Sequence, residues 1–455
     1  SAASDVYKRQ LFMFFKQFYN DHLSHASYLI GCQRTNEALI VDPNKDLQQY
    51  IDVANKEGFT ITQAVETHIH ADYASGIRDV AKLLNAHIHV SKEGDDSLGY
   101  KNMPDNTHFV GHEDIIKVGH IELKVLHTPG HTPESISFLL TDIGGGSSVP
   151  MGLFTGDFLF VGDIGRPDLL EKAVSVEGST EIGAKAMFKS IQSTKDLPDY
   201  IQIWPGHGAG SPCGKALGAI PMSTLGYERE NNWAFKIDDE SQFIDTLTSE
   251  QPDPPTHFAK MKEINQFGSE LISPYEVYPL AHDDESLLHF DLRSREAFHG
   301  GHQHGAINIP YDKNFINQIG FYLNYDEEII LIGEHDTVNQ AAKTLQWIGF
   351  NQVKGYIKPS PDIMTNTVGA ATITGQEEHI LDIRSQDEFN RGHIEHAVHI
   401  PHGQLMRENI PFNHDDKIYV HCQSGVRSSI AIGILEHRGF TNILNVKEGY
   451  SKIDV

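Results

Sequence analysis

The sequence predicts an α/β protein of three domains: a layered domain in which strands and helices alternate, followed by two copies of a smaller α/β domain. Three observations predict this class. The 455 residues are about three times the usual domain size. Short apolar runs of strand type alternate with segments of helical periodicity up to about residue 265. An internal repeat then occupies the remainder of the chain.

The first domain, which we place at residues 13–267, is a succession of strands separated by Gly, Pro and Asp turns. A helix is expected over 46–57, where apolar residues recur at helical spacing, and Gly58 is expected to end it. The proline-rich stretch 251–255 marks a connection near the domain's end. Strands are expected within 28–42 (two), and at 61–67, 87–90, 121–127, 135–140 and 201–204.

The two smaller domains are placed at 268–360 and 361–455, because their sequences repeat. The run 291–298 (Asp-Leu-Arg-Ser-Arg-Glu-Ala-Phe) matches 382–389 (Asp-Ile-Arg-Ser-Gln-Asp-Glu-Phe), and Pro310 matches Pro401 at the same offset. An apolar strand and a Gly-Phe helix end also match, at slightly smaller offsets. Two copies of one fold, with a short insertion or deletion between them, explain the pattern.

Composition excludes several classes of function. Lys and Arg total 36 against 62 Asp and Glu, so the net charge of −26 would repel nucleic acid and anionic membranes. No apolar run is long enough to cross a bilayer, so a soluble protein is expected. Three widely spaced cysteines argue against a disulfide framework and favour a cytoplasmic location. We take residues 1–12 as an extension without a signal-peptide core.

Histidine is over-represented, with 27 copies, and several follow predicted strands, where ligands gather in α/β proteins. Four segments stand out in order along the chain: His68-x-His70-x-Asp72, Pro-Gly-His131, Thr-Gly-Asp157 and Pro-Gly-His207. Together they resemble the metallo-β-lactamase superfamily. The resemblance implies an αββα sandwich, two sheets covered by helices on both outer faces, for the first domain.

The resemblance also implies a metal site. Binuclear zinc hydrolases of this superfamily, such as glyoxalase II, carry a histidine where this sequence has Tyr73. The persulfide dioxygenases of the same fold look closer. By that resemblance His68, His131 and Asp157 would hold a single Fe(II), a set that leaves positions for a sulfur substrate and O₂. Tyr73 and His207 would then contact substrate or orient the ligands.

Two further residues of this domain are candidates, each with a structural alternative. Arg166 matches an arginine near the dioxygenase site and would pair with an anionic substrate group, or it pairs structurally with an aspartate. Cys213, shortly after His207, would accept sulfur, or it is an inert small hydrophobe. Cys32 lies in a predicted strand, where core packing is expected.

The second candidate site is the loop 422–427, Cys-Gln-Ser-Gly-Val-Arg, between an apolar strand and a helix. A helix N-terminus stabilises a thiolate, so Cys422 is a candidate nucleophile and Arg427 its partner. The loop resembles that of rhodanese sulfurtransferases, whereas related cysteine phosphatases, the alternative, carry one residue more. In the first copy Gly333 and Thr337 are expected at these two positions, in a loop shorter by one residue, so that copy is expected to be inactive.

The whole chain resembles bacterial persulfide dioxygenase–sulfurtransferase fusions of sulfide detoxification. The resemblance implies oxidation of a low-molecular-weight thiol persulfide with O₂ to sulfite, and thiosulfate formation at Cys422. It also implies a homo-oligomer, a dimer or tetramer. Two alternatives remain: a zinc thioester hydrolase of glyoxalase II type fused to a rhodanese, and a sulfur-relay protein without metal chemistry.

Overall fold

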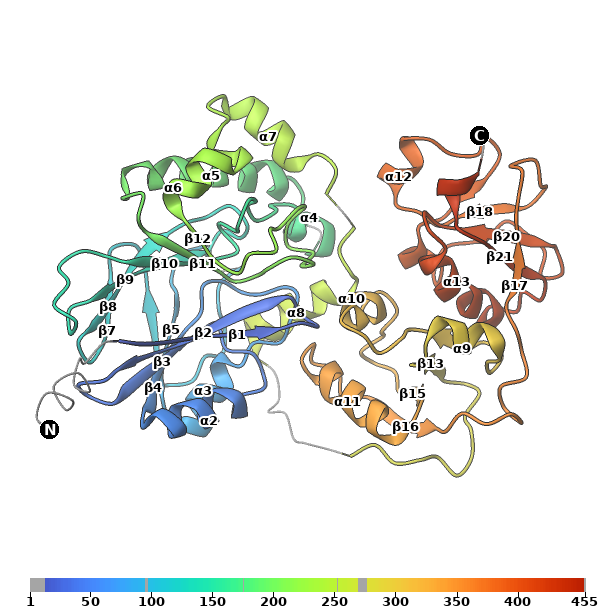
Figure 1. The fold of residues 1–455 in the computed structure, drawn as a ribbon, viewed down its shortest axis with the longest axis horizontal. Helices are drawn as coiled ribbons and strands as arrows, with labels where there is room; N and C mark the ends of the chain where they lie inside the picture. Colours follow the sequence, from blue (N-terminus) through green and yellow to red (C-terminus); the bar gives the residue numbers. More distant parts are fainter. Residues whose placement is uncertain (1–12, 95–96, 175, 252, 269–275, 454–455) are drawn as a thin grey trace, which may run out of the picture. The chain divides into compact units, whose positions relative to one another are not determined.

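The computed structural model describes residues 13–94, 97–174, 176–251, 253–268 and 276–453 (Figure 1). The extension predicted at residues 1–12 lies outside them. The chain divides into two compact units, residues 1–272 with 347–349, and the rest of the chain. Within the described ranges, none of the helices combines the length and apolar character that crossing a bilayer requires.

The first unit is built on two six-stranded sheets. The first sheet has the strand order β1-β2-β3-β4-β5-β6 and the second the order β12-β11-β10-β9-β8-β7. Both are mixed. In the first sheet β3, β4, β5 and β6 run parallel and the hairpin β1–β2 is antiparallel; in the second, β10 and β11 run parallel and the hairpin β8–β9 is antiparallel. The strands of the first sheet are β1 (Phe14–Asn20), β2 (His25–Cys32), β3 (Glu37–Val41), β4 (Thr60–Val65), β5 (His87–Ser91) and β6 (Thr107–Val110). Those of the second are β7 (Ile115–Val118), β8 (Ile121–His127), β9 (Ile136–Asp142), β10 (Gly152–Gly156), β11 (Gln202–Pro205) and β12 (Ser223–Thr224).

A large apolar core fills the space between the two sheets. It contains fully buried aromatic side chains from both, among them Tyr28, Phe138, Phe154 and Trp204. Alternate residues of each strand point into this layer, as expected for sheets packed face to face. The buried Cys32 belongs to this core, which supports the packing role predicted for it.

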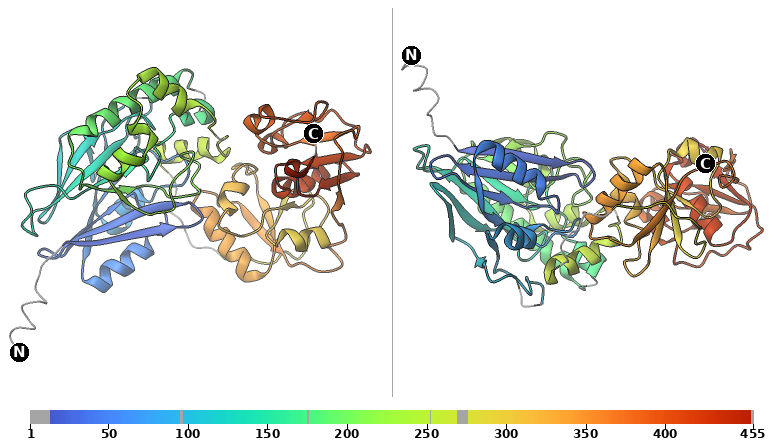
Figure 2. Two further views of the ribbon diagram at one scale, coloured as in Figure 1. Left: turned by 45° about the horizontal axis from the view of Figure 1, so that its top comes forward. Right: turned by 90° about the horizontal axis from the view of Figure 1, so that it is seen from below.

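Helices cover the outer face of each sheet, so the unit is the predicted αββα sandwich (Figures 1 and 2). The helices α2 and α3 pack on the first sheet, and α5 and α7 on the second. Gly58 ends α2 in the left-handed conformation, as predicted. The helices of this unit are α2 (Gln48–Glu57), α3 (Ile77–Leu84), α4 (Leu169–Val174), α5 (Ser179–Ser193), α6 (Leu225–Asn231), α7 (Glu240–Thr248) and α8 (His257–Phe267), with short 3₁₀ turns η2 (Thr194–Asp196) and η3 (Trp233–Phe235).

The second unit contains two all-parallel sheets, one from each copy of the repeat. The first sheet has the order β14-β13-β15-β16 and the second β17-β21-β20-β18-β19. The elements of the first copy are β13 (Leu288–Asp291), α9 (Arg295–Gly300), β14 (Ile307–Asn308), α10 (Phe315–Ile319), β15 (Ile329–Ile332), α11 (His335–Gln346) and β16 (Val353–Ile357). Those of the second are β17 (Gly369–Ala371), β18 (Ile380–Asp382), α12 (Gln386–Asn390), β19 (Val398–His399), η4 (His402–Gln404), β20 (Ile418–His421), α13 (Val426–His437), β21 (Ile443–Val446) and η5 (Tyr450–Lys452).

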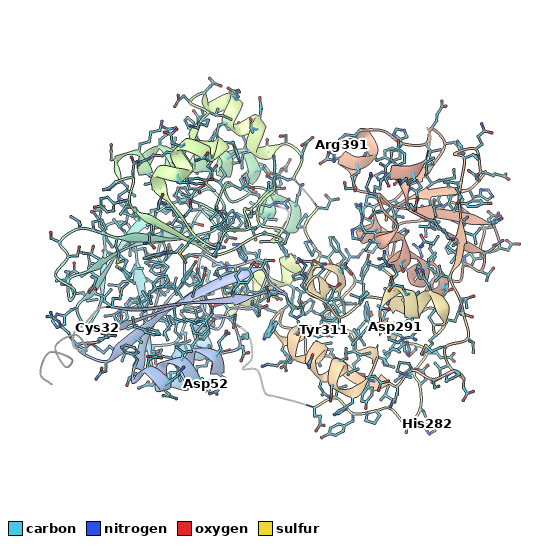
Figure 3. The ribbon with its side chains drawn as sticks, viewed as in Figure 1. Cys32, Asp52, His282, Asp291, Tyr311 and Arg391 are labelled. Atoms are coloured by element: carbon cyan, nitrogen blue, oxygen red, sulfur yellow. The ribbon has the colours of Figure 1, made fainter. Side chains whose placement is uncertain are left out.

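The repeat is visible in the local structure of both copies. Asp291 ends β13 and accepts hydrogen bonds from Arg293, and Ser294 then caps α9 (Asp291 is labelled in Figure 3). Asp382 and Arg384 repeat this arrangement before α12. The same residues therefore end a strand and start a helix twice.

From the strand end to the matched helix end, the second copy is longer than the first by one residue, as predicted. Residues 333 and 334 join β15 to α11, whereas residues 422–425 join β20 to α13. The two helices end in the same way, with the Phe350 N–H donating to Leu345 and the Phe440 N–H to Leu435, so Thr337 stands at the position of Arg427, as predicted. The boundary predicted at 267/268 falls at the end of α8, and residues 269–275 lie outside the described part of the chain.

Candidate active sites

The polar residues of the first unit gather where five strands end. Asp42 follows β3, His68 lies in the loop after β4, His131 in the loop after β8, Asp157 directly after β10 and His207 just after β11. These strands run in compatible directions, so their carboxyl ends meet at one edge of the sandwich. All five side chains are buried.

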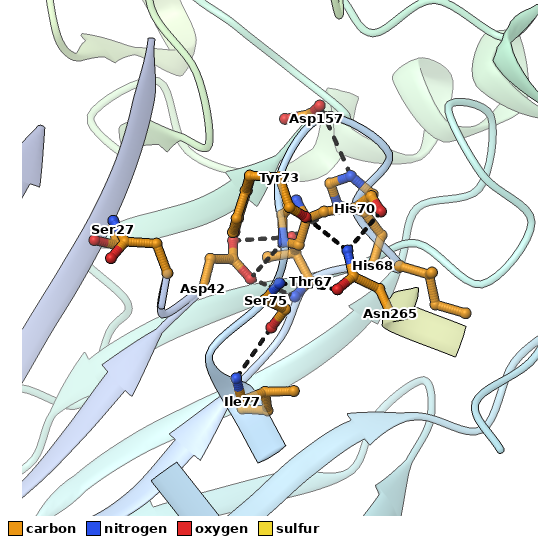
Figure 4. A network of polar contacts seen from close by, with 12 residues as sticks. Ser27, Asp42, Thr67, His68, His70, Tyr73, Ser75, Ile77, Asp157 and Asn265 are labelled. Carbon is orange, nitrogen blue, oxygen red and sulfur yellow. Dashed lines mark hydrogen bonds and ion pairs between the residues drawn. The ribbon is translucent and has the colours of Figure 1, made fainter. Parts of the chain in front are cut away.

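Asp42 and Thr67 fix the orientation and the tautomer of His68 (Figure 4). Asp42 accepts hydrogen bonds from the Thr67 backbone N–H at 2.7 Å and from its hydroxyl at 2.9 Å. The hydroxyl has only one hydrogen, so it must accept the Nδ1–H of His68, 3.0 Å away. His68 therefore presents an unprotonated Nε2 to the site.

His131 is oriented in the same way by a different group. Its Nδ1 lies 2.8 Å from the backbone oxygen of Arg166, which can only accept, so Nδ1 carries the proton and Nε2 is free. The Nε2 atoms of His68 and His131 lie 3.7 Å and 3.5 Å from Oδ2 of Asp157. Two imidazole lone pairs and one carboxylate oxygen thus converge on one point.

This group fits a divalent metal ion. The ligand atoms of His68, His131 and Asp157 lie within 4.8 Å of one another. Among the described residues, neither Nε2 of His68 nor Oδ2 of Asp157 has a hydrogen-bond partner, although both are buried. Burial lowers the pKa of His131, and burial together with nearby His70 lowers that of His68, so both imidazoles are neutral, as metal ligands must be. The donor set is the two-histidine, one-carboxylate set of mononuclear iron sites.

His207 lies between two carboxylates beside this group. Its Nδ1 is 2.7 Å from Oδ1 of Asp157 and its Nε2 is 2.7 Å from Oδ2 of Asp72. Although burial acts in the opposite direction, these two carboxylates raise the pKa of His207 well above its usual value. Burial also opposes ionisation of Asp157, yet His207 holds the pKa of that carboxyl well below its usual range. His207 therefore leaves Oδ2 of Asp157 free for a metal.

A second group, Asp72, His207 and Cys213, lies next to the first, and its ligand atoms are equally close together. Cys213 is fully buried, and burial with the carboxylates of Asp72 and Asp157 raises the pKa of its thiol well above the usual value. The structure places Cys213 beside the candidate metal site, where the predicted role as sulfur acceptor would need it, but in surroundings that keep the resting thiol protonated.

Arg166 forms the structural ion pair with an aspartate that was the alternative to a role in binding substrate. Its guanidinium forms two parallel hydrogen bonds of 2.7 Å with Asp168 and a third with the backbone oxygen of Pro212. The side chain is fully buried. Its backbone orients His131, whereas a role in binding substrate stays a prediction.

Helix α8 stabilises the loop that carries His68, a contact that no pattern in the sequence indicates. The Asn265 side chain donates to the backbone oxygens of His70 and Tyr73 and accepts from the backbone N–H of Ser75. Lys262 donates to the backbone oxygen of Ile69. A polar residue on a helix distant in sequence could be assigned to this loop only from the tertiary structure.

The second candidate site is the loop from Cys422 to Arg427. The Gly425 N–H donates to the Cys422 sulfur at 3.1 Å, and the Ser428 hydroxyl lies 3.7 Å from it. Gly425 adopts a positive φ of 86° before α13, which lets the loop fold around the sulfur. The thiol is buried at the helix N-terminus, where an anionic sulfur is stabilised.

Arg427 is held by an acidic partner rather than free. Its guanidinium forms two hydrogen bonds of 2.7 Å with Glu388, the residue that forms the capping box of α12 with Ser385. Burial works against ionisation of Glu388, but Arg427 and the Ser385 N–H lower the pKa of its carboxyl to about 2.

The fold and these two sites define a class: a metalloenzyme of the metallo-β-lactamase fold that carries two rhodanese-like domains. The comparisons agree. The family model described as "Metallo-beta-lactamase superfamily" matches residues 20–207, and the model described as "Rhodanese-like domain" matches residues 273–358 and 368–454. A solved structure described as a metallo-β-lactamase from Staphylococcus aureus subsp. aureus COL is 68% identical and covers 76% of this chain and 99% of its own, with a TM-score of 0.73. The chain belongs to the metallo-β-lactamase superfamily.

Two more distant relatives match about half of the chain. A hydroxyacylglutathione hydrolase of Nitrosococcus oceani is 28% identical over 266 residues, which span 52% of this chain and 93% of the relative. The solved structure of ETHE1 from Myxococcus xanthus is 25% identical, covers 56% of this chain and 98% of its own, and has a TM-score of 0.46.

Proposed function

We propose that the protein oxidises low-molecular-weight thiol persulfides with O₂ and transfers sulfane sulfur, in sulfide detoxification. The observation that carries the proposal is the convergence of two neutral imidazoles and one carboxylate, His68, His131 and Asp157, on one buried point. The loop of Cys422 in the same chain, in a domain of rhodanese type, supports the coupling to sulfur transfer.

In the first reaction R–S–SH, O₂ and water give R–SH and sulfurous acid, which ionises to sulfite. His68, His131 and Asp157 would hold one Fe(II) ion, which supplies the redox chemistry and the open positions that substrate and O₂ need. His207 holds Asp157 in place through Oδ1, and the buried surroundings exclude bulk water. Tyr73, His207 and Arg166 stand as the proposed substrate contacts.

In the second reaction the Cys422 thiolate takes the outer sulfur of a persulfide and releases R–SH. Sulfite then attacks the outer sulfur of the Cys422 persulfide, the S–S bond breaks, and thiosulfate leaves while the thiolate is restored. The Gly425 N–H stabilises the sulfur anion at both stages. Cys213 is the alternative acceptor. We propose no nucleic acid or membrane partner, a cytoplasmic location and a homo-oligomer, a dimer or tetramer.

The test is oxygen uptake by iron-loaded protein on addition of glutathione persulfide, with sulfite and thiosulfate measured in the same sample. Wild-type protein should consume O₂ and form thiosulfate. Cys422→Ser should still consume O₂ but release sulfite in place of thiosulfate, because it lacks only the sulfur acceptor. Cys32→Ser, a substitution in the core away from both sites, should behave as wild type. Loss of oxygen uptake in Cys422→Ser would contradict the division of labour.

The second candidate is a zinc-dependent thioester hydrolase of the glyoxalase II type fused to a rhodanese. Similarity to the hydroxyacylglutathione hydrolase favours it. Tyr73, where the binuclear enzymes carry a histidine, weighs against it. Zinc-loaded protein that hydrolyses a glutathione thioester, together with iron-loaded protein that takes up no O₂, would establish this second function.

A further inference from the structure

Among the buried polar side chains beside the candidate metal site that lack a hydrogen-bond partner in the described residues are two whose rings lie against each other. They are His25, with both ring nitrogens unpaired, and Tyr73, with its hydroxyl unpaired. His25 is 1% exposed and Tyr73 is 0% exposed. Their ring centroids are 4.2 Å apart, so the two side chains form one group, which we call the His25–Tyr73 pair.

The backbone holds His25 firmly at this place. Residues 25 and 207 form an isolated antiparallel bridge, with the Ala26 N–H donating to Gly206 at 2.7 Å and the Gly208 N–H to Ser24 at 3.0 Å. Ser24 adopts φ of 50°, a left-handed conformation that strains a non-glycine residue. The first residue of β2 is thus fixed beside the end of β11, although the two segments are far apart in sequence.

One side chain, that of His207, lies between the pair and the candidate metal ligand Asp157. The ring of His25 is 5.6 Å from the ring of His207, which bonds Asp157 directly. Tyr73 also contacts His70, at 4.5 Å between ring centroids. The pair therefore lies beside the group of His68, His131 and Asp157 without belonging to it.

Tyr50 is a buried tyrosine of the same domain whose hydroxyl has partners within the protein, and it serves as the comparison for Tyr73. It is also fully buried, but its hydroxyl bonds the Ser27 hydroxyl at 2.7 Å and accepts from the Asn44 N–H at 3.2 Å. A buried polar group without such partners destabilises the folded state. Retaining two of them at one point indicates that something else completes their hydrogen bonds.

We propose that the His25–Tyr73 pair binds the anionic sulfur end of the substrate beside the metal ligands. This assignment rests on the proposed persulfide chemistry. The Tyr73 hydroxyl donates one hydrogen bond, and the neutral His25 ring donates a second through one nitrogen. Neither group carries a charge at neutral pH, so the pair holds an anion without adding to the charge around the metal.

The experiment compares Tyr73→Phe with Tyr50→Phe, since each change removes only a hydroxyl from a fully buried ring. In Tyr73→Phe the KM for glutathione persulfide should rise about tenfold, the effect of one lost hydrogen bond, with iron content unchanged. The melting temperature should stay equal or rise, because no bond within the protein is lost. In Tyr50→Phe the KM should not change, and the melting temperature should fall by about 2–4 °C.

A second pair of variants tests His25. His25→Leu should raise KM by at least as much as Tyr73→Phe, and His25→Gln, which keeps a donor, should recover part of the loss. An unchanged KM in both Tyr73→Phe and His25→Leu would overturn the proposal. A fall in melting temperature of Tyr73→Phe to that of Tyr50→Phe would also overturn it, because the hydroxyl would then have a structural partner such as a buried water.

Failure of the proposed function would give a different result. The melting temperatures require no substrate, so they report on the pair even if the wild-type protein consumes no O₂. In that case KM is measured for hydrolysis of a glutathione thioester, and a rise of this KM in Tyr73→Phe would overturn the persulfide assignment.

Discussion

A single hydroxyl decides which nitrogen of His68 can bind a metal. The carboxylate of Asp42 takes the only hydrogen of the Thr67 hydroxyl, and the hydroxyl can therefore only accept from His68. Groups that orient ligands in this way are commonly worth 10- to 100-fold in metal affinity.

Thr67→Val should accordingly lower the affinity for iron about 10- to 100-fold, because the imidazole of His68 loses the acceptor that fixes its tautomer and orientation. Competition with a chelator measures the affinity. Thr67→Ser retains the hydroxyl and is the matched control, expected to bind iron like wild type. Equal affinity in Thr67→Val and wild type would show that the hydroxyl has no such role.

The Glu388–Arg427 pair should stabilise the second rhodanese-like domain in a pH-dependent way. The folded-state pKa of Glu388 is about 2, below its ordinary value of 4.5, so the stabilisation is complete above pH 4.5 and disappears as pH falls toward 2. Because the pair is partly exposed, we expect about 1 kcal/mol. The melting temperature of wild type should exceed that of Glu388→Gln by a constant margin between roughly pH 6 and 8. The margin should shrink below pH 4.5, and a margin that grew in acid would contradict the assignment.

At the scale of elements, α8 stabilises a loop that it does not adjoin in sequence. Asn265→Leu would remove three hydrogen bonds to residues 70–75 and leave buried backbone groups unpaired, so we expect a loss of about 3 kcal/mol of unfolding free energy. Iron affinity should fall as well, since this loop continues from His68. Lys260→Gln, on the partly exposed side of α8, is the control and should change stability by less than about 0.5 kcal/mol. Normal iron binding by Asn265→Leu would show that the hydrogen bonds of Asn265 to this loop do not contribute to metal binding.

Also at this scale, loop length and a thiol distinguish the two copies of the repeat. Both copies of the repeat end a parallel strand and begin a helix of the same length at this position. Residues 422–425 give the second copy room to fold the backbone around a sulfur, with the Gly425 N–H pointing at it. Residues 333 and 334 give the first copy neither the length nor the thiol.

For the whole molecule, removal of the metal should affect one unit only. At a free metal concentration about 100 times the dissociation constant, binding stabilises the unit that holds it by about 2.7 kcal/mol. In calorimetry, a chelator should lower the unfolding transition of the first unit and leave that of the second in place. Asp157→Asn, which lacks one proposed ligand, should not respond to the chelator. A shift of both transitions would place metal binding in both units.

The sequence by itself determined much of this protein, because its signals are local. Hydrophobic periodicity placed α2, and a glycine with a positive φ ended it. Strand-end histidines and aspartates indicated the candidate metal group, and the repeated Asp-x-Arg-Ser run revealed two copies of one domain. The matches on both sides of the shorter loop also placed Thr337 at the position of Arg427.

Only the tertiary structure decided how distant segments meet at the site. Asn265 braces a loop almost 200 residues before it, and His25 joins the site through a bridge to His207, contacts that leave no periodic or motif signal. The protonation of His68 follows from Asp42 on a neighbouring strand, and that of His207 from two carboxylates on separate loops. Sequence fixes which groups are present, but hydrogen bonding and burial depend on three-dimensional neighbours, and these set the charge and orientation of every group in the site.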